Sequence, residues 1–399
     1  MATSRTCLCE SNQSPEALGG LKVPSPDEIV ISDETLRDGE QHPGVVLTGE
    51  EKLEIARLLD DLGVHEISVG TPMVSDAEKE SAINLVKAGL KAELNCLVRA
   101  VKGDIDRAME CGLKMIRMGL PVGKPLRTSE MGNKSYAEIL KMGVDACRYA
   151  KDNGLYVIFS ATDCTRAEVQ LLKDTFKAGI EEGGADRVRM PDTVGCANPQ
   201  AYGYLVSEVR KVAGDVPVEV HTHDDFGLAL ANCLAGMFAG ARVLTATVNG
   251  IGERAGNTAL EELLMCLRLL YGIEFDMKYE KLYRLSKVVQ QHTRTPVSSF
   301  KAVVGDKIFA HESGAPAKAN IVDPMGAQSY EASMVGQAMR ILIGKKSGAF
   351  ALEWKLREMG IDLPKEKVNS MLPNVKTLAE NQKSELSDDQ LRAIAAKFM

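Results

Sequence analysis

The chain has 399 residues, of which 45% are hydrophobic and 26% are charged, and its formal net charge is -7 at pH 7. This length suits one large barrel with an appendage, and the composition is that of a globular protein with a sizeable core. No basic stripe is present that could neutralise phosphates, which excludes nucleic-acid binding as the main function. A small anionic substrate stays compatible with the acidic balance, because one pocket can still be cationic.

The sequence contains no recognisable membrane or export signal. No apolar run reaches the length of about 18 residues that a transmembrane helix needs, and residues 1–20 lack the apolar core of a signal peptide. The nine cysteines are an odd number and do not form the pattern of a disulfide framework. We therefore expect a cytoplasmic protein that does not bind membranes.

Short Val/Ile-rich runs alternate with amphipathic stretches along most of the chain, after an N-terminal extension expected over residues 1–27. Several amphipathic stretches end in Gly, a common helix C-cap. The runs expected to be strands are residues 28–33, 66–70, 93–100, 115–120, 155–161, 187–192, 218–223 and 243–250. Eight such βα repeats predict an α/β fold, a (β/α)8 TIM barrel over residues 28–275. A doubly wound open sheet is the alternative, and the lack of G-x-G-x-x-G after the first run disfavours it.

Residues 276–399 show mainly helical patterns and are expected to form small, mainly helical C-terminal subdomains. They include a polar, Gly-rich segment at 311–333 that is too long for a simple connection, and such segments are usually functional or disordered. A final helix is expected within residues 387–399, with Ser387 or Asp388 as its N-cap.

Polar residues cluster where three of the expected strands end, and that end of a TIM barrel carries the active site. Asp38 follows the first strand, His221 and His223 end the seventh, and Asn257 follows the eighth. Histidines two apart on a strand point to the same side, and strands seven, eight and one are neighbours in a closed barrel. Two imidazoles, a carboxylate and an amide oxygen suit Mg²⁺, Mn²⁺, Zn²⁺ or Fe²⁺, with positions left for water or substrate. A hydrogen-bonded pair of core histidines is the alternative, which the neighbouring acidic and Gly-rich segments disfavour.

The segment after the first strand also offers groups that could act on a substrate. Arg37 precedes the expected aspartate ligand, and its guanidinium could bind a developing alkoxide or enolate because it does not lose its proton. A salt bridge to Glu40 or Glu253 is the alternative role for this arginine. Gln41, in the same segment, is a further candidate for substrate binding.

Two residues elsewhere could hold carboxylates of a substrate. Thr193, in the sequence PDTVG after the sixth strand, could hydrogen-bond a carboxylate or could be a turn residue. Arg99, at the end of the third strand, could hold a second carboxylate or could form an ordinary ion pair.

Four motifs together resemble the DRE-TIM metallolyase superfamily. They are ISDETLRDGEQHPGV, MPDTVGCANP, EVHTHDDFGLALANCLAGMFAGA and NGIGERAGNTALEELL. They are most similar to the acyl-CoA-condensing branch, which holds the 2-isopropylmalate, homocitrate, citramalate and Re-face citrate synthases. FAHESGAPAKA and LIGKKSG resemble motifs of that branch's C-terminal subdomain, so the resemblance covers about residues 28–350.

The resemblance implies a metal site formed by Asp38, His221, His223 and Asn257, with Arg37 as the polarising residue and Thr193 binding the carboxylate of a 2-oxo acid. It implies a Claisen-type condensation in which a divalent metal (Mg²⁺, Mn²⁺ or Zn²⁺) acts as a Lewis acid on the 2-oxo acid. A base removes a proton from the methyl group of acetyl-CoA, the carbanion attacks the keto carbon, and the thioester is then hydrolysed. The resemblance also implies a homodimer in which the C-terminal segment of one chain reaches the partner's barrel.

Two positions depart from the family pattern, and both belong to its proton-transfer apparatus. Thr162 stands where the synthases carry a glutamate, and Ala315 and Pro316 stand where they carry Ile-His. The general base must then be sought elsewhere, since a base needs hydrogen-bond reach to the proton it removes. By their proximity to these positions, the candidates are Asp163, His311, Glu312 and Tyr330.

The residues expected to line the substrate pocket are ambiguous about the acceptor. The segment after the fourth strand, residues 119–122, is similar to that of nitrogen-fixation homocitrate synthases, whereas residues 95–99 lack the histidine of lysine-pathway homocitrate synthases. We expect condensation of acetyl-CoA with a dicarboxylic 2-oxo acid, giving citrate or homocitrate. A lyase or aldolase that cleaves a carbon–carbon bond next to a 2-oxo acid is the main alternative. A non-catalytic barrel is a third reading, which the intact metal and arginine positions disfavour.

Overall fold

The computed structural model describes residue 6 and residues 8–399, and the chain divides into two compact units. Residues 11–278 and 284–296 form the first, which we call the barrel unit. Residues 279–283 and 297–399, with the described residues up to Glu10, form the second, which we call the C-terminal unit. The segment expected to be an N-terminal extension is therefore shared between the units, and its residues 1–5 and 7 lie outside the described residues.

The sequence places residues 284–296 with the C-terminal subdomains, whereas in the structure they fold with the barrel. They contain most of α11 (Leu282–Thr293), whose Leu285 and Val289 are buried. The Ser286 hydroxyl donates a hydrogen bond of 2.5 Å to Asn249 Oδ1, and Asn249 returns one of 3.1 Å to the Ser286 carbonyl. These two bonds join the helix to the turn that follows the last barrel strand.

Eight parallel strands close into a barrel in chain order, which confirms the predicted TIM-barrel fold. The ring closes where β1 pairs with β8, with Val30 opposite Val243. The strands are β1 (Val30–Asp33), β2 (Glu66–Ser68), β3 (Glu93–Arg99), β4 (Met115–Pro121), β5 (Tyr156–Thr162), β6 (Arg187–Asp192), β7 (Val218–Thr222) and β8 (Val243–Ala246). The eighth strand is shorter than predicted, because residues 248–250 form a 3₁₀ turn in which Asn249 adopts φ 62°.

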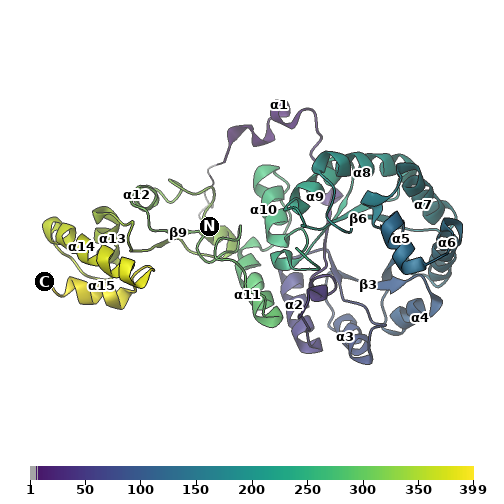
Figure 1. Cartoon of the computed structure of the whole chain (residues 1–399), viewed down its shortest axis with the longest axis horizontal. Helices are drawn as coiled ribbons and strands as arrows, with labels where there is room; N and C mark the ends of the chain where they lie inside the picture. Colours follow the sequence, from purple (N-terminus) through teal and green to yellow (C-terminus); the bar gives the residue numbers. More distant parts are fainter. Residues whose placement is uncertain (1–5, 7) are drawn as a thin grey trace. The chain divides into compact units, whose positions relative to one another are not determined.

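Helices surround the strands of the barrel unit (Figure 1). The helices of this unit are α1 (Pro15–Leu18), α2 (Gly49–Leu62), α3 (Asp76–Lys87), α4 (Lys102–Glu110), α5 (Lys124–Met131), α6 (Tyr136–Asp152), α7 (Val169–Glu181), α8 (Pro199–Ala213), α9 (Ala229–Phe238) and α10 (Leu260–Leu270), together with α11. Local sequence signals explain their ends. Thr48 caps α2 in a capping box with Glu51, and Gly63 ends that helix at φ 106°, a conformation that favours glycine.

The C-terminal unit has a hydrophobic core of its own, built on α13 (Ala349–Glu358), α14 (Lys365–Gln382) and α15 (Asp388–Ala395). Leu352, Met371 and Leu391 are fully buried in it. Helix α15 begins after Ser387, whose hydroxyl accepts from Gln390 N–H, so the predicted final helix and cap are confirmed. The polar segment 311–333 is not a structureless loop, because it contains α12 (Gly314–Val322). This helix lies in the chain between two short strands that pair with each other, β9 (Ala310–His311) and β10 (Arg340–Ile341).

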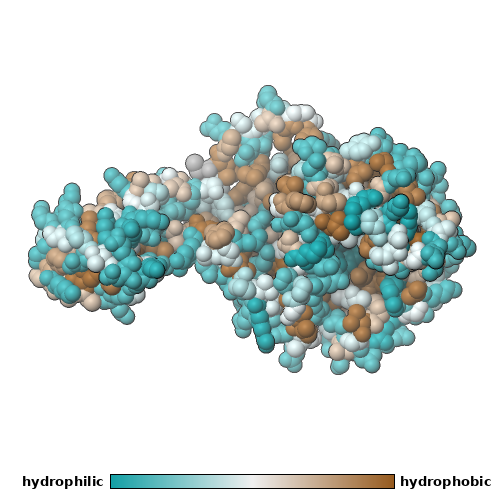
Figure 2. All heavy atoms as spheres, viewed as in Figure 1, coloured by the Kyte–Doolittle hydropathy of each residue, from teal (hydrophilic) through white to brown (hydrophobic). Residues whose placement is uncertain are grey.

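The surface of both units is mixed on the face seen in Figure 2, where hydrophobic side chains lie among hydrophilic ones. In the described part of the chain, no helix combines the length and the apolar composition that crossing a bilayer requires.

Candidate metal centre and active site

A cavity of about 460 Å³ opens at the carboxyl ends of the barrel strands. All of its lining residues belong to the barrel unit. Inward-facing positions recur with a period of two along the strands that line it, as in the pairs 117 and 119, 160 and 162, and 221 and 223. The residues that matter most below are Arg37, Asp38, Arg117, Arg189, His221 and His223.

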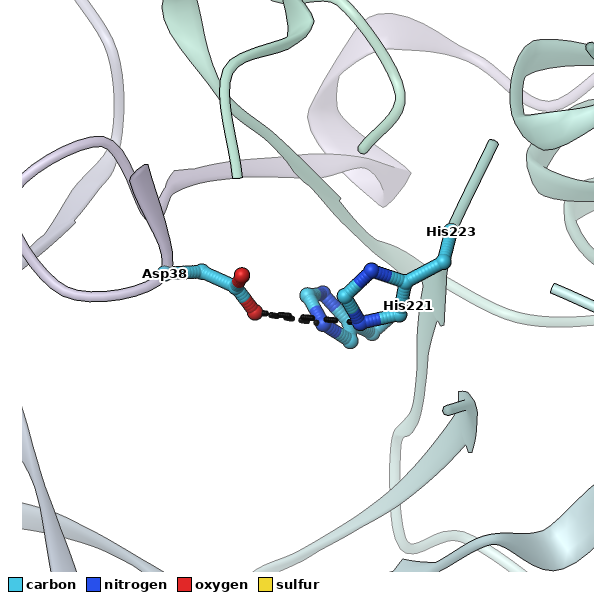
Figure 3. Close-up of side chains that lie close together, drawn as sticks. All are labelled: Asp38, His221 and His223. Carbon is cyan, nitrogen blue, oxygen red and sulfur yellow. Dashed lines mark ion pairs between the residues drawn. The ribbon is translucent and has the colours of Figure 1, made fainter. Parts of the chain in front are cut away.

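Asp38, His221 and His223 meet in this cavity, as the sequence predicts. Figure 3 shows the carboxylate of Asp38 directed toward both imidazoles. His221 Nε2 lies 3.1 Å and His223 Nε2 lies 3.9 Å from Asp38 Oδ2, and one ligand atom from each residue falls within 4.8 Å of the others. All three side chains are buried. This is the geometry of a metal site, because donor atoms that share one cation must lie within such a distance of one another.

Unsatisfied polar atoms around this cluster show that a cation fits. Asp38 Oδ1, His223 Nδ1 and Asn257 Oδ1 are buried without a hydrogen-bond partner among the described residues. Buried polar atoms in that state are costly unless something else binds them. Asn257 lies beside His223 through an isolated β-bridge, which brings the amide close to the cluster. Gly252 leaves the space open, since a Cβ there would lie 2.1 Å from Asn257 Nδ2 and 3.1 Å from Asp38 Oδ1.

The surrounding groups keep the ligands in their metal-binding protonation states. Thr245 Oγ1 donates to the Val220 carbonyl at 3.1 Å, so it accepts from His221 Nδ1 at 2.8 Å and leaves Nε2 of that ring as the acceptor. Burial, together with the nearby Arg189, lowers the pKa of His221 well below its usual value. Although burial opposes ionisation of Asp38, the adjacent Arg37 guanidinium holds the pKa of its carboxyl well below the usual range. Neutral imidazoles and an ionised carboxylate are the forms that bind metals.

The Arg37 guanidinium is fixed between two carboxylates. Its Nε and Nη2 lie 2.7 Å and 2.6 Å from Glu34 Oε2, and its Nη1 lies 2.9 Å from Asp38 Oδ2. Its ion pairs are not with Glu40 or Glu253, each of which pairs with another cation. Arg37 therefore presents a positioned positive charge beside the metal cluster.

Two arginines inside the barrel were missed by the sequence analysis. Arg117 on β4 and Arg189 on β6 are buried, line the cavity, and both bind Glu34 Oε1 through Nη1. Although burial opposes ionisation of Glu34, the three arginines around it hold the pKa of its carboxyl well below the usual range. A signal was present in the sequence, since each arginine interrupts an apolar run expected to be buried on both faces, where a charge needs a partner.

Further charged residues continue this network deeper in the barrel. Arg189 also binds Glu219 on β7 at 2.6 Å, and Arg187 on β6 binds Glu219 at 3.0 Å and, across the barrel, Glu66 on β2 at 2.6 Å. The interior of the barrel is thus a layer of ion pairs beneath the metal cluster.

Two of the predicted substrate-binding residues, Thr193 and Gln41, line the cavity, and Arg99 does not. Thr193 lines the cavity, and its hydroxyl accepts from the Asp163 backbone N–H at 2.8 Å, so its own hydrogen is free to donate. Gln41 also lines the cavity and accepts from Arg37 at 3.3 Å. Arg99 does not line the cavity, and its side chain is 77% exposed in a two-point pair with Asp104, at 2.7 Å and 2.9 Å. That is the ion-pair arrangement which the sequence left as an alternative.

The four candidates for the general base are divided between the two units. Asp163 is buried but turned to Arg166, with which it forms bonds of 2.7 Å and 2.9 Å. His311, Glu312 and Tyr330 belong to the C-terminal unit. There His311 Nε2 lies 3.5 Å from Gln328 Oε1, and the other two are engaged with residues of that unit. Their roles therefore stay predictions.

Glu130 on α5 lines the cavity as a carboxylate that the sequence analysis did not single out. It has no ion pair or hydrogen bond to another described residue. Partial burial, together with Asp163, raises the pKa of its carboxyl. Its helical segment carries no motif, so only the closed barrel reveals that it reaches the cavity.

Comparison with known proteins agrees with this site. Residues 28–289 match the family described as HMGL-like, and residues 303–383 match one described as homocitrate synthase post-HMGL domain-like. A homocitrate synthase of Methanothermobacter thermautotrophicus is 43% identical over 360 residues, which cover 90% of this chain and 91% of that protein. A 2-isopropylmalate synthase of Methanocaldococcus jannaschii is 42% identical over 95% of this chain and 73% of its own length. An (R)-citramalate synthase of the same organism is 42% identical over 92% of this chain and 74% of its own length.

The fold is also that of solved structures. The crystal structure of an HMG-CoA lyase of Bacillus subtilis matches with a TM-score of 0.61 and 21% identity, covering 70% of this chain and 98% of the lyase. That similarity supports the barrel architecture. The family matches, the relatives and the buried ligand cluster together show that the chain belongs to the HMGL-like (DRE-TIM) family and is an acyltransferase of the homocitrate, isopropylmalate and citramalate synthase type.

Proposed function

We propose that this acyltransferase condenses acetyl-CoA with a dicarboxylic 2-oxo acid of the oxaloacetate or 2-oxoglutarate class. The observation that carries the choice of acceptor is the charge of the barrel interior. Four buried arginines face four buried carboxylates there: Arg37, Arg117, Arg187 and Arg189 against Glu34, Asp38, Glu66 and Glu219. The interior is therefore balanced on its own, and a divalent cation would add two positive charges. A dianionic acceptor compensates those charges, whereas an acceptor with one carboxylate leaves a buried charge uncompensated.

The residues of the cavity support this condensation in distinct roles. Asp38, His221, His223 and Asn257 would hold the divalent cation, which when bound supplies Lewis-acid polarisation of the keto group. Arg37 stabilises the negative charge that develops on the former keto oxygen, since it is already fixed beside the site and needs no reorganisation. Thr193 donates its free hydroxyl hydrogen to the carboxylate next to the keto group, and Gln41 donates its amide N–H to the acceptor.

The proton acceptor for acetyl-CoA is proposed to come from the C-terminal unit of a second copy in a homodimer. His311, Glu312 and Tyr330 are the candidates, and the family resemblance supports their supply in trans. Mixing two inactive variants tests this arrangement. Arg37→Ala chains and His311→Ala chains should each be inactive alone, and mixed dimers should regain up to about a quarter of the native activity if the two residues act across the interface. No recovery, from dimers shown to have exchanged subunits, would contradict supply in trans by His311.

Release of CoA tests the proposed function directly. The protein is incubated with acetyl-CoA, a divalent metal and a panel of 2-oxo acids, and free thiol is measured. Release that depends on a dicarboxylic 2-oxo acid supports the proposal. Release only with pyruvate or another monocarboxylic 2-oxo acid would contradict the acceptor class. Thr162 lines the cavity where the synthases carry a glutamate, which keeps the lyase or aldolase direction as the second candidate. Formation of pyruvate from hydroxy-oxo acids, without thiol release, would favour that second candidate.

A further inference from the structure

We infer that Arg117 on β4, together with Ser160 on the adjacent strand β5, binds the second carboxylate of the acceptor and so determines the preference for a diacid. The inference rests on the proposed function, and it assigns to β4 a role that the sequence analysis considered for Arg99 on β3. Arg117 Nη1 is bound to Glu34, while its Nη2 is buried and has no hydrogen-bond partner among the described residues. The residue itself is 2% exposed and lines the cavity.

An unpaired guanidinium nitrogen at this position indicates a missing acceptor. A buried N–H without a partner costs free energy, and that cost is greater for a charged group. The other two arginines that surround Glu34 each have a further carboxylate: Arg37 binds Asp38, and Arg189 binds Glu219. For Arg117 the described residues provide Glu34 alone. Two parallel N–H bonds to one carboxylate are the geometry that a guanidinium favours, so an acidic ligand is the natural partner for Nη2.

The strand positions around Arg117 leave room for such a ligand. Gly119 follows Arg117 by two residues and therefore faces the same side of β4, and it also lines the cavity. A Cβ at Gly119 would lie 3.1 Å from Thr162 Oγ1, so the lack of a side chain keeps this part of the cavity open. Ser160 on β5 pairs with Gly119 in the sheet, lines the cavity, and has no hydrogen bond from its hydroxyl to another described residue. One guanidinium and one hydroxyl thus lie on adjacent strands as donors.

The position of Arg117 relative to the metal cluster suits a short diacid. Glu34 binds Arg37 through Oε2 and Arg117 through Oε1, so a single carboxylate separates the two guanidinium groups. Arg37 in turn binds Asp38. An acceptor could therefore have one end at the metal cluster and the other end at Arg117, with the Glu34 carboxylate between those two positions. Arg99 is outside the cavity lining and already has two bonds to Asp104.

Pairs of acceptors that differ only in the second carboxylate measure how much that carboxylate contributes to kcat/KM. Oxaloacetate is compared with 2-oxobutanoate, and 2-oxoglutarate with 2-oxopentanoate, so that each pair differs in one terminal carboxylate. The wild type should prefer the diacid of one pair. Arg117→Gln should lower kcat/KM for that diacid by roughly 30-fold or more, while the monoacid changes little, because the loss of one partner of a buried charged pair has an effect of that size. Ser160→Ala should lower it less, by roughly 5-fold.

Control variants distinguish a loss of diacid recognition from a general loss of folding or metal binding. Arg117→Lys keeps the positive charge next to Glu34 but loses the planar fork, so it should fold and bind Mn²⁺ like the wild type while still losing the preference for the diacid. Arg148→Met removes an exposed arginine on α6, outside the cavity, and should leave the preference unchanged. If Arg117→Lys does not fold, Gly119→Ala takes its place, since the added methyl group should lower kcat/KM for the diacid more than for the monoacid.

The outcomes separate this inference from the proposed function. Binding of the diacid to the Mn²⁺-loaded protein, measured by calorimetry without acetyl-CoA, should weaken in Arg117→Lys even if no acceptor supports turnover. Unchanged discrimination in Arg117→Lys or, in its place, Gly119→Ala would overturn the role of Arg117 while leaving the condensation intact. The same conclusion would follow if Arg99→Met lost the preference and Arg117→Gln kept it. Failure of every 2-oxo acid to release CoA would instead reject the proposed function.

Discussion

Gly252→Ala is the change that tests the metal site without removing any of its ligands. The added Cβ would lie 2.1 Å from Asn257 Nδ2 and 3.1 Å from Asp38 Oδ1. Real Cβ atoms do not approach closer than about 3.0 Å, so the Asn257 amide must retreat by nearly 1 Å. Ligand distances in metal sites tolerate changes of only about 0.2 Å. We therefore expect the metal affinity to fall roughly 10- to 100-fold, the range typical of changes to groups that orient ligands.

The assay is the binding of Mn²⁺ to metal-free protein, followed by calorimetry and by the loss of the free-ion paramagnetic signal. The matched control is Gly103→Ala on α4, where an added Cβ meets nothing within 4 Å. That control should bind Mn²⁺ like the wild type and should be slightly more stable, because alanine is favoured over glycine within a helix. Native Mn²⁺ affinity in a folded Gly252→Ala protein would refute the packing of Gly252 against the ligands. Lack of Mn²⁺ binding by the wild type would refute the metal site itself.

Three further predictions concern single side chains. His223→Ala should abolish tight Mn²⁺ binding and CoA release while the circular dichroism spectrum stays native, and full activity after chelation would exclude its role as a ligand. Arg37→Lys should lose most turnover with little change in metal content, because lysine offers one point charge in place of a fork held by Glu34 and Asp38, and a near-native rate would make this arginine structural. Burial raises the pKa of Asp33 from 3.8 to about 7, so the folded chain keeps a proton that the unfolded chain releases. This stabilisation is complete below about pH 4 and is lost as the pH rises through 7, so Asp33→Asn should flatten the fall in melting temperature over that interval, and an unchanged slope would count against the shift.

Much of the fold follows from the sequence because its signals are local. A strand buried on both faces has to be a short apolar run, and eight such runs separated by amphipathic helices leave few arrangements other than a barrel. The metal cluster follows from two simple rules. His221 and His223 are two apart on one strand, and barrel closure makes the end of β7 a neighbour of the segment that carries Asp38. The last helix follows from Ser387 and Gln390, which form its capping box.

The ion pairs inside the barrel could not be predicted in the same way, because the two residues of each pair are distant from each other in the sequence. Glu34 and Arg117 are 83 residues apart, and Glu34 and Arg189 are 155 apart, yet each pair forms an ion pair. The sequence of a single strand does not show which distant carboxylate forms an ion pair with an arginine on that strand. Arg99 illustrates the reverse, since Asp104 lies only five residues away and occupies its guanidinium. The number of charges was visible in the sequence, and their pairing depended on closure of the barrel.

The balanced interior has a consequence for the order in which ligands bind. The cost of desolvating buried charges offsets much of the attraction within an ion pair. Stability of the fold alone therefore does not account for a network of four buried arginines and four buried carboxylates. A divalent cation at Asp38 would make the cavity positive, and a diacid would restore neutrality. Binding of each should therefore strengthen binding of the other, by the same factor in either order. Calorimetry should show the diacid binding at least roughly 10-fold more tightly to the Mn²⁺-loaded protein than to the metal-free protein, with the matched monoacid gaining less. Equal gains for the diacid and the monoacid would mean that the metal acts only at the shared 2-oxo carboxylate, and the charge argument for a dicarboxylic acceptor would fail.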